Sequence, residues 1–129
     1  MAENIALVRR FYDFGAASDS EAGAPTFAPE AVWHVPGDNP VSGAYHGVDA
    51  ITYDIGARMQ PLDDWRIDVV DVMGSADIVV SVLFLVGRRR GRTVDMPGGH
   101  VFRFDDEGRI FEAWGFAADQ PKLDEFFSA

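Results

Sequence analysis

Two histidines, each inside a short apolar segment, are the residues of this chain best suited to proton chemistry. His34 lies within residues 31–37 (AVWHVPG) and His100 within residues 98–104 (GGHVFRF). An imidazole titrates near neutral pH and can act as a base, an acid or a hydrogen-bond donor. If both rings faced one dry cavity, neutral His34 would take a proton beside a carbonyl group. His100 would then donate a hydrogen bond to the developing oxyanion, so both are candidate catalytic residues.

Strand alternation predicts which way His100 faces. Side chains two residues apart share one face of a strand, so His100, Phe102 and Phe104 lie together, opposite Arg103. A charged guanidinium is costly to bury. The His100 face is therefore predicted to be the interior one.

Alternation does not decide the orientation of His34. Either Val32 and His34 or Trp33 and Val35 face inward, and both pairs contain apolar side chains. Each histidine also has a purely structural interpretation, as a half-buried ring that bonds a backbone carbonyl or a neighbouring side chain.

The remaining polar motifs favour structural roles. Asp119, before Gln120 and Pro121, is typical of a helix N-cap, Asp95 of a hairpin edge, and His46 of an exposed loop. The chain has no cysteine, no closely spaced histidine pair, no glycine-rich nucleotide loop and no nucleophile elbow. We therefore predict neither a cofactor nor a metal.

Composition limits the class of partner. The chain has 129 residues, 47% of them hydrophobic, which predicts one packed domain over residues 1–129. Its 21 acidic and 11 basic residues give a net charge of −10, which disfavours nucleic acid and anionic lipid. The arginine-rich residues 87–92 are predicted to form a solvated hairpin tip. Neither a signal peptide nor a membrane span is recognised, so a cytoplasmic location is predicted.

Hydrophobic periodicity and turn signals predict the elements that must position the histidines. Helices are expected over residues 4–18, 20–27, 49–60 and 119–127, and strands over 31–36, 65–73, 78–88, 97–104 and 109–117. Pro29 is expected to break the chain before the first strand, and residues 37–47 to form a loop. The last four strands should form an antiparallel meander joined by tight turns, one of them at residues 105–108. Helices followed by such a meander indicate an α+β fold.

Several segments together resemble a known family. Residues 32–37, 42–51, 100–104 and 113–120 are similar to a SnoaL-like polyketide-cyclase domain of the nuclear transport factor 2 superfamily. The resemblance implies a cone-shaped, curved antiparallel sheet wrapped around N-terminal helices, the NTF2-like or cystatin-like fold. It also implies a deep apolar pocket and a homodimer.

The related ketosteroid isomerases suggest roles for individual positions. By that resemblance His34 stands where those enzymes keep a carboxylate base, and His100 where they keep a protonated acid. Phe11 stands where they place a tyrosine donor, so a shared pocket is implied without the same catalytic set. The candidate substrate-binding residues are Phe11, Val32, Trp33, Phe102, Trp114 and Phe116.

Three functions follow from this reasoning. The first is cofactor-independent proton transfer, of isomerase or cyclase type, on a small apolar carbonyl compound such as an aromatic polyketide or another cyclic ketone. The second is a non-catalytic module that binds a hydrophobic metabolite, and the third is a dimer whose pocket is filled by its own side chains. A cavity below about 300 Å³ would not accept a drug-sized ligand, and the first two functions would then fail together.

Overall fold

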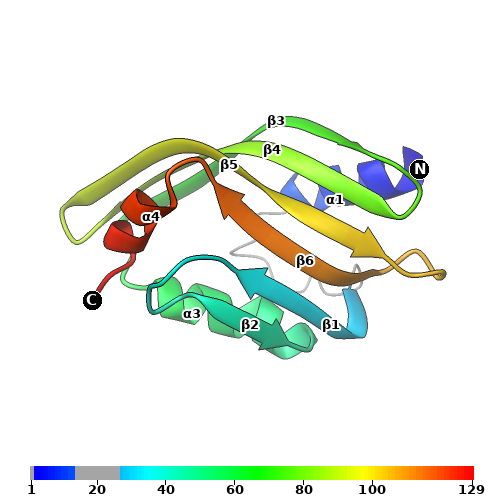
Figure 1. The fold of residues 1–129 in the computed structure, drawn as a ribbon, viewed down its shortest axis with the longest axis horizontal. Helices are drawn as coiled ribbons and strands as arrows, with labels where there is room; N and C mark the ends of the chain where they lie inside the picture. The colour runs from blue at the N-terminus through cyan, green and yellow to red at the C-terminus, as the bar shows by residue number, and fades with distance from the viewer. Residues whose placement is uncertain (1, 14–26) are drawn as a thin grey trace.

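The computed structural model describes residues 2–13 and 27–129. Six strands form one curved sheet in the order β2-β1-β6-β5-β4-β3 (Figure 1). The strands are β1 (Phe27–Val35), β2 (Gly43–His46), β3 (Asp64–Gly74), β4 (Ile78–Arg89), β5 (Arg92–Phe104) and β6 (Ile110–Ala117). The helices are α1 (Ala2–Asp13), a π-helical turn η2 (Ala50–Asp54), α3 (Ile55–Met59) and α4 (Gln120–Phe126). The predicted α+β class with a curved sheet is confirmed.

The sheet is mixed rather than wholly antiparallel. Strands β3 to β6 form the expected antiparallel meander. Strand β1 then pairs in parallel with β6 and antiparallel with β2. In Figure 1, α1 lies behind β3 and β4, whereas α3 lies next to β1 and β2. The helices therefore cover one face of the sheet.

Two predictions near the start of the sheet are wrong. Strand β1 begins at Phe27 and continues through Pro29, which was expected to break the chain. The register of β1 on β6 shifts between Phe27 and Val32, and a proline without an N–H is tolerated at such an irregularity. The predicted loop at residues 37–47 also contains the short strand β2. The predicted helical residues 14–18 and 20–26 lie outside the described residues.

Alternation along β4 defines the two faces of the sheet. Val79, Ser81, Leu83 and Leu85 are buried toward the helices, while the residues between them are half-buried or exposed. The buried residues gather in two clusters. One, around Phe11 and the aromatic residues of β1 and β5, lies beneath α1. The other lies beside α3 and α4.

The arginine-rich hairpin tip is only partly solvated. Arg90 and Gly91 form the tight turn, with φ angles of 54° and 77°, as expected for a two-residue hairpin loop. Arg89, by contrast, is 3% exposed and donates hydrogen bonds to carbonyl oxygens of the Met59–Gln60 and Phe126–Ser128 segments. The hydrogen bonds to those oxygens offset the cost of burying the charge. Because the acceptors lie at the ends of α3 and α4, the guanidinium links both helices to β4.

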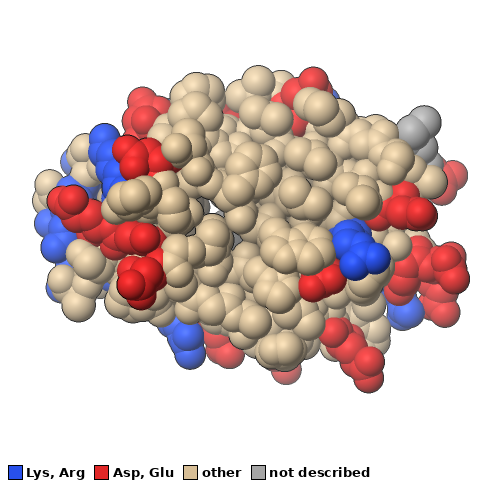
Figure 2. Space-filling view, in the orientation of Figure 1, with Lys and Arg blue, Asp and Glu red and all other residues tan. Residues whose placement is uncertain are grey.

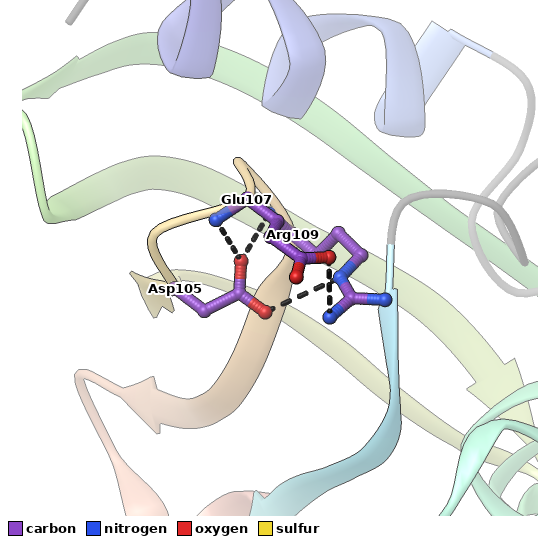
Figure 3. Close-up of polar contacts among 3 residues, drawn as sticks. All are labelled: Asp105, Glu107 and Arg109. Carbon is purple, nitrogen blue, oxygen red and sulfur yellow. Dashed lines mark hydrogen bonds and ion pairs between the residues drawn. The ribbon is translucent and has the colours of Figure 1, made fainter.

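The predicted turn between β5 and β6 is confirmed, and Asp105 organises it. The Asp105 carboxylate accepts hydrogen bonds from the backbone N–H groups of Glu107 and Arg109, both at 2.9 Å, and from Arg109 Nε at 3.3 Å (Figure 3). These bonds, led by that from the Arg109 N–H, lower the pKa of Asp105.

Among the described helices, none is long and apolar enough to cross a bilayer.

Candidate functional site

A cavity of about 150 Å³ lies where the two buried clusters meet. Its walls come from α1, η2, α3, α4 and every strand except β2, with aromatic rings prominent among them. Representative lining residues are Phe11, Phe27, Trp33, Trp65, Phe116 and Phe127. Apolar walls of this kind favour an apolar ligand.

His100 is the only titratable side chain among the described residues that line the cavity. Thr52 adds a hydroxyl, and the other lining side chains are apolar or aromatic. The edge of the Trp33 ring meets the His100 ring with centroids 4.9 Å apart. Gly115 leaves room beside the imidazole, because a Cβ there would lie 3.6 Å from His100 Cδ2 and 3.2 Å from Pro36.

The Tyr12 hydroxyl bonds the His100 ring, and the Ser81 hydroxyl bonds both Tyr12 and the His100 backbone. Tyr12, in the last turn of α1, places its hydroxyl oxygen 2.5 Å from His100 Nδ1 and 2.7 Å from Ser81 Oγ. Ser81 lies directly opposite His100 in the β4–β5 pairing, and its Oγ accepts the His100 backbone N–H at 3.0 Å. The network therefore joins one helix and two strands at the back of the cavity.

Burial determines the protonation states of the His100 imidazole and the Tyr12 phenol. It lowers the pKa of His100 to about 4 and raises the pKa of Tyr12 above its ordinary value. At pH 7 the imidazole is therefore neutral and the phenol keeps its proton. A neutral imidazole against apolar walls can donate a hydrogen bond to a ligand oxygen or act as a weak base.

The structure places His34 away from this cavity, so the expectation that both imidazoles face one hollow is wrong. His34 Nε2 lies 2.8 Å from a Glu112 carboxylate oxygen, and the ring stacks on Trp114 with centroids 5.4 Å apart. Glu112 also accepts from Arg103 at 3.4 Å. Trp33 and not His34 points inward, because the apolar indole gains more from burial than an imidazole with a carboxylate partner outside.

The other predicted binding residues divide between the two faces. Phe11, Trp33 and Phe116 line the cavity. Phe102 is fully buried beside Phe11 and Trp33 and does not reach the cavity surface. Val32 and Trp114 also fall outside the lining: Val32 shares the strand face of His34, and Trp114 stacks on the His34 ring. These two residues and Phe102 are corrections to the predicted binding role.

Sequence reasoning missed Tyr12 and Ser81 as site residues. A signal for each was present: Tyr12 lies beside Phe11 on the predicted buried face of the first helix, and Ser81 interrupts the apolar run of β4. A polar residue in a buried strand needs a hydrogen-bond partner, but the sequence does not say which one.

Other predicted polar residues occupy structural positions. Asp119 caps α4, with its carboxylate accepting from the Lys122 N–H at 3.2 Å, and Asp95 and His46 are exposed. Within residues 2–13 and 27–129, no group of three or more acidic, histidine or cysteine side chains could hold a metal ion.

The sequence model of the SnoaL-like domain matches residues 8–113. The chain belongs to the SnoaL-like domain family. This SnoaL-like protein is also similar to solved structures over nearly its whole length. One is a cystatin-like protein of unknown function from Xanthomonas campestris, 26% identical, with a TM-score of 0.87 and 98% of each chain covered.

Two further solved structures share the fold of this SnoaL-like protein. One, titled a SnoaL-like polyketide cyclase, is from Jannaschia sp. CCS1: it is 21% identical, with a TM-score of 0.80, 99% of this chain and 93% of that chain covered. The other is TerC co-crystallised with polyporic acid: it is 19% identical, with a TM-score of 0.81, 96% of this chain and 97% of that chain covered. No curated protein matches the chain.

Proposed function

We propose that this SnoaL-like protein binds a small, neutral carbonyl compound in its cavity, with His100 donating a hydrogen bond to the carbonyl oxygen. The observation that carries the proposal is the single neutral imidazole among apolar cavity walls. A buried polar group in such a pocket fixes ligand orientation, while the apolar walls supply most of the binding free energy.

The size of the cavity narrows the class of ligand. A volume of about 150 Å³ is below the roughly 300 Å³ that a drug-sized ligand needs, so neither of the two pocket functions holds for a ligand of that size. It equals the volume of an engineered protein cavity of about 150 Å³ that holds benzene. A ligand with one six-membered ring therefore fits, whereas an aromatic polyketide with several fused rings does not.

Cofactor-independent proton transfer on that carbonyl compound is a second candidate function. Donation from His100 would stabilise an enolate oxygen, and one such donor contributes about 10² to 10³ in rate. His34 cannot supply the base, since it lies on the other face of the sheet. The lining residues described contain no carboxylate, so we expect proton exchange to be slow and binding to be the principal activity.

Cyclohexanone provides a test of both candidate functions. We expect His100→Leu to weaken its binding about fivefold, because a hydrogen bond of about 1 kcal/mol is lost. His34→Leu is the matched control and should bind as the wild type does. Unchanged binding in His100→Leu overturns the proposal. Incubation of the same ketone in heavy water, followed by NMR, measures exchange of the protons beside the carbonyl and detects proton transfer.

We further propose that the protein forms a homodimer through the outer face of its sheet. Apolar side chains of β4 are exposed there, including Ile78 at 41% and Phe84 at 40%. Figure 2 shows that most of this face is uncharged, with acidic and basic side chains gathered toward its edges. Exposed apolar patches of this kind mark interaction sites.

The charge distribution supports a second copy as the occupant. Each chain carries a net charge of −10, so two copies repel each other except where the surface lacks net charge. On the outer face Glu112 is balanced by Arg103 and contacts His34.

The net charge of −10 supports the prediction that neither nucleic acid nor an anionic membrane is a partner. A cytoplasmic location stays a prediction.

A further inference from the structure

The hydrogen bonds behind His100 have a direction that the distances help to assign. Ser81 Oγ accepts the His100 backbone N–H at 3.0 Å, and a backbone N–H can only donate. The proton of the Ser81 hydroxyl then has two possible acceptors, the Tyr12 oxygen at 2.7 Å and the His100 carbonyl oxygen at 3.4 Å. The shorter contact is a normal hydrogen bond and the longer one is marginal.

Donation from Ser81 to Tyr12 leaves the Tyr12 proton free to bond His100 Nδ1. The reverse direction, with Nδ1–H donating to Tyr12 and Tyr12 donating to Ser81, would leave the Ser81 proton only the 3.4 Å contact. The phenol keeps its proton because burial raises its pKa. The Ser81-to-Tyr12-to-His100 direction therefore makes the better set of bonds.

We propose that Ser81 and Tyr12 are positioning residues that hold His100 as the tautomer protonated on Nε2, so that the cavity selects ligands carrying an acceptor oxygen. Nδ1 is occupied by Tyr12, and Nε2 has no hydrogen-bond partner among the described residues. His100 and Gly115 both line the cavity, and Cδ2, the ring carbon bonded to Nε2, is the His100 atom nearest to Gly115. This inference rests on the proposed function for the ligand contact, but the tautomer does not depend on it.

The tautomer can be measured directly by NMR of ¹⁵N-labelled histidine in the intact protein at pH 7. We expect His100 Nε2 to carry the proton and Nδ1 to show the shift of a nitrogen that accepts a hydrogen bond. In Tyr12→Phe the Nδ1 signal should move toward that of a nitrogen without a partner. Tyr45→Phe is the matched control, because it removes another buried tyrosine hydroxyl, bonded to the Val41 carbonyl oxygen at 2.6 Å.

The ligand preference is tested with cyclohexanone and methylenecyclohexane, which share a shape but differ in the acceptor oxygen. We expect the wild type to bind the ketone about fivefold more tightly than the alkene, and Tyr12→Phe to lose most of that preference through weaker ketone binding. The Tyr45→Phe control should retain it. If Tyr12→Phe does not fold, Ser81→Ala should shift the Nδ1 signal in the same direction by a smaller amount.

The outcomes separate the two proposals. A proton on Nδ1 in the wild type, or a Nδ1 signal unchanged in Tyr12→Phe, overturns the positioning role of Tyr12 and Ser81, whatever the ligand data show. A proton on Nε2 without any ketone preference supports the positioning role of Tyr12 and Ser81 and overturns both the ligand selection and the proposed function.

Discussion

The two central histidines differ in chemistry because their surroundings differ. His100 is held by Tyr12 and Ser81 beneath an apolar cavity, whereas His34 lies against Glu112 and Trp114 on the outer face. Both sit in short apolar segments, and alternation along the sequence predicted the inward face for His100 but left His34 undecided. The distinction comes from which strand face the tertiary structure buries.

The pKa of His100 predicts a loss of stability in mild acid. In the unfolded chain the imidazole has a pKa near 6.5, and in the folded protein about 4, so the unfolded state binds more protons between those values. Stability is therefore full above about pH 6.5 and falls as the pH drops toward 4, by about 3 kcal/mol at most.

Chemical denaturation at a series of pH values measures this effect. A His100→Phe variant should lack that part of the pH dependence, whereas His46→Gln, which alters an exposed histidine, should retain it. A wild-type stability that is constant between pH 6.5 and 4.5 would contradict the neutral, buried His100.

The contact between His34 and Glu112 predicts a smaller energetic role. Both side chains are partly exposed, at 35% and 26%, and pairs of this kind contribute about 1 kcal/mol or less. We expect His34→Leu to change the free energy of unfolding by no more than that amount, measured by urea titration. A loss of several kcal/mol would show that the pair has a larger structural role than its exposure implies.

At the scale of elements, the cap of α4 gives a separate prediction. The Asp119 carboxylate accepts the Lys122 N–H, and Pro121 stands in the first turn, where its missing N–H is not needed. Asp119→Ala should lower the free energy of unfolding by about 1 kcal/mol, and Asp119→Asn by clearly less, because asparagine also caps. Equal losses in the two variants would contradict the capping role.

Most elements could be predicted because their periodicity is local. The alternation of β4, the turn at Asp105 and the Asp119–Pro121 helix start all follow from neighbouring residues. Strand β2 and the parallel pairing of β1 with β6 could not, because they depend on contacts between distant segments. The proline in β1 was misleading for the same reason, since only the register shift on β6 makes it tolerable there.

The candidate site was less predictable than the fold. His100 was placed correctly by the rule that Arg103 must lie on the opposite, solvated face of β5. The strand predicted over residues 31–36 contained no charged residue to set the orientation of His34, because Glu30 lies in β1 but before the predicted start, and the family resemblance indicated the wrong face. The partners of His100 come from elements 19 and 88 residues distant in sequence, a separation that no local pattern encodes.

At the scale of the whole molecule, the proposed dimer predicts that charge on the outer face separates the copies. Phe84 is 40% exposed at the centre of β4, so Phe84→Asp would place like charges opposite each other in a dimer. We expect this variant to sediment as a monomer in analytical ultracentrifugation, with ketone binding retained. Thr93→Asp, an exposed change at the far hairpin, is the control and should stay dimeric. A wild-type monomer at high micromolar concentration would contradict the dimer.

The guanidinium of Arg89 gives residues 126–128 a structural role as hydrogen-bond acceptors. It holds the carbonyl oxygens of Phe126 and Ser128 together with those of Met59 and Gln60, and Arg92 reaches Ser128 as well. Deletion of the residues after Phe126 would remove the Ser128 carbonyl oxygen, which is one of the backbone acceptors of the buried Arg89 guanidinium. A shortened variant of the protein should therefore keep Ser128.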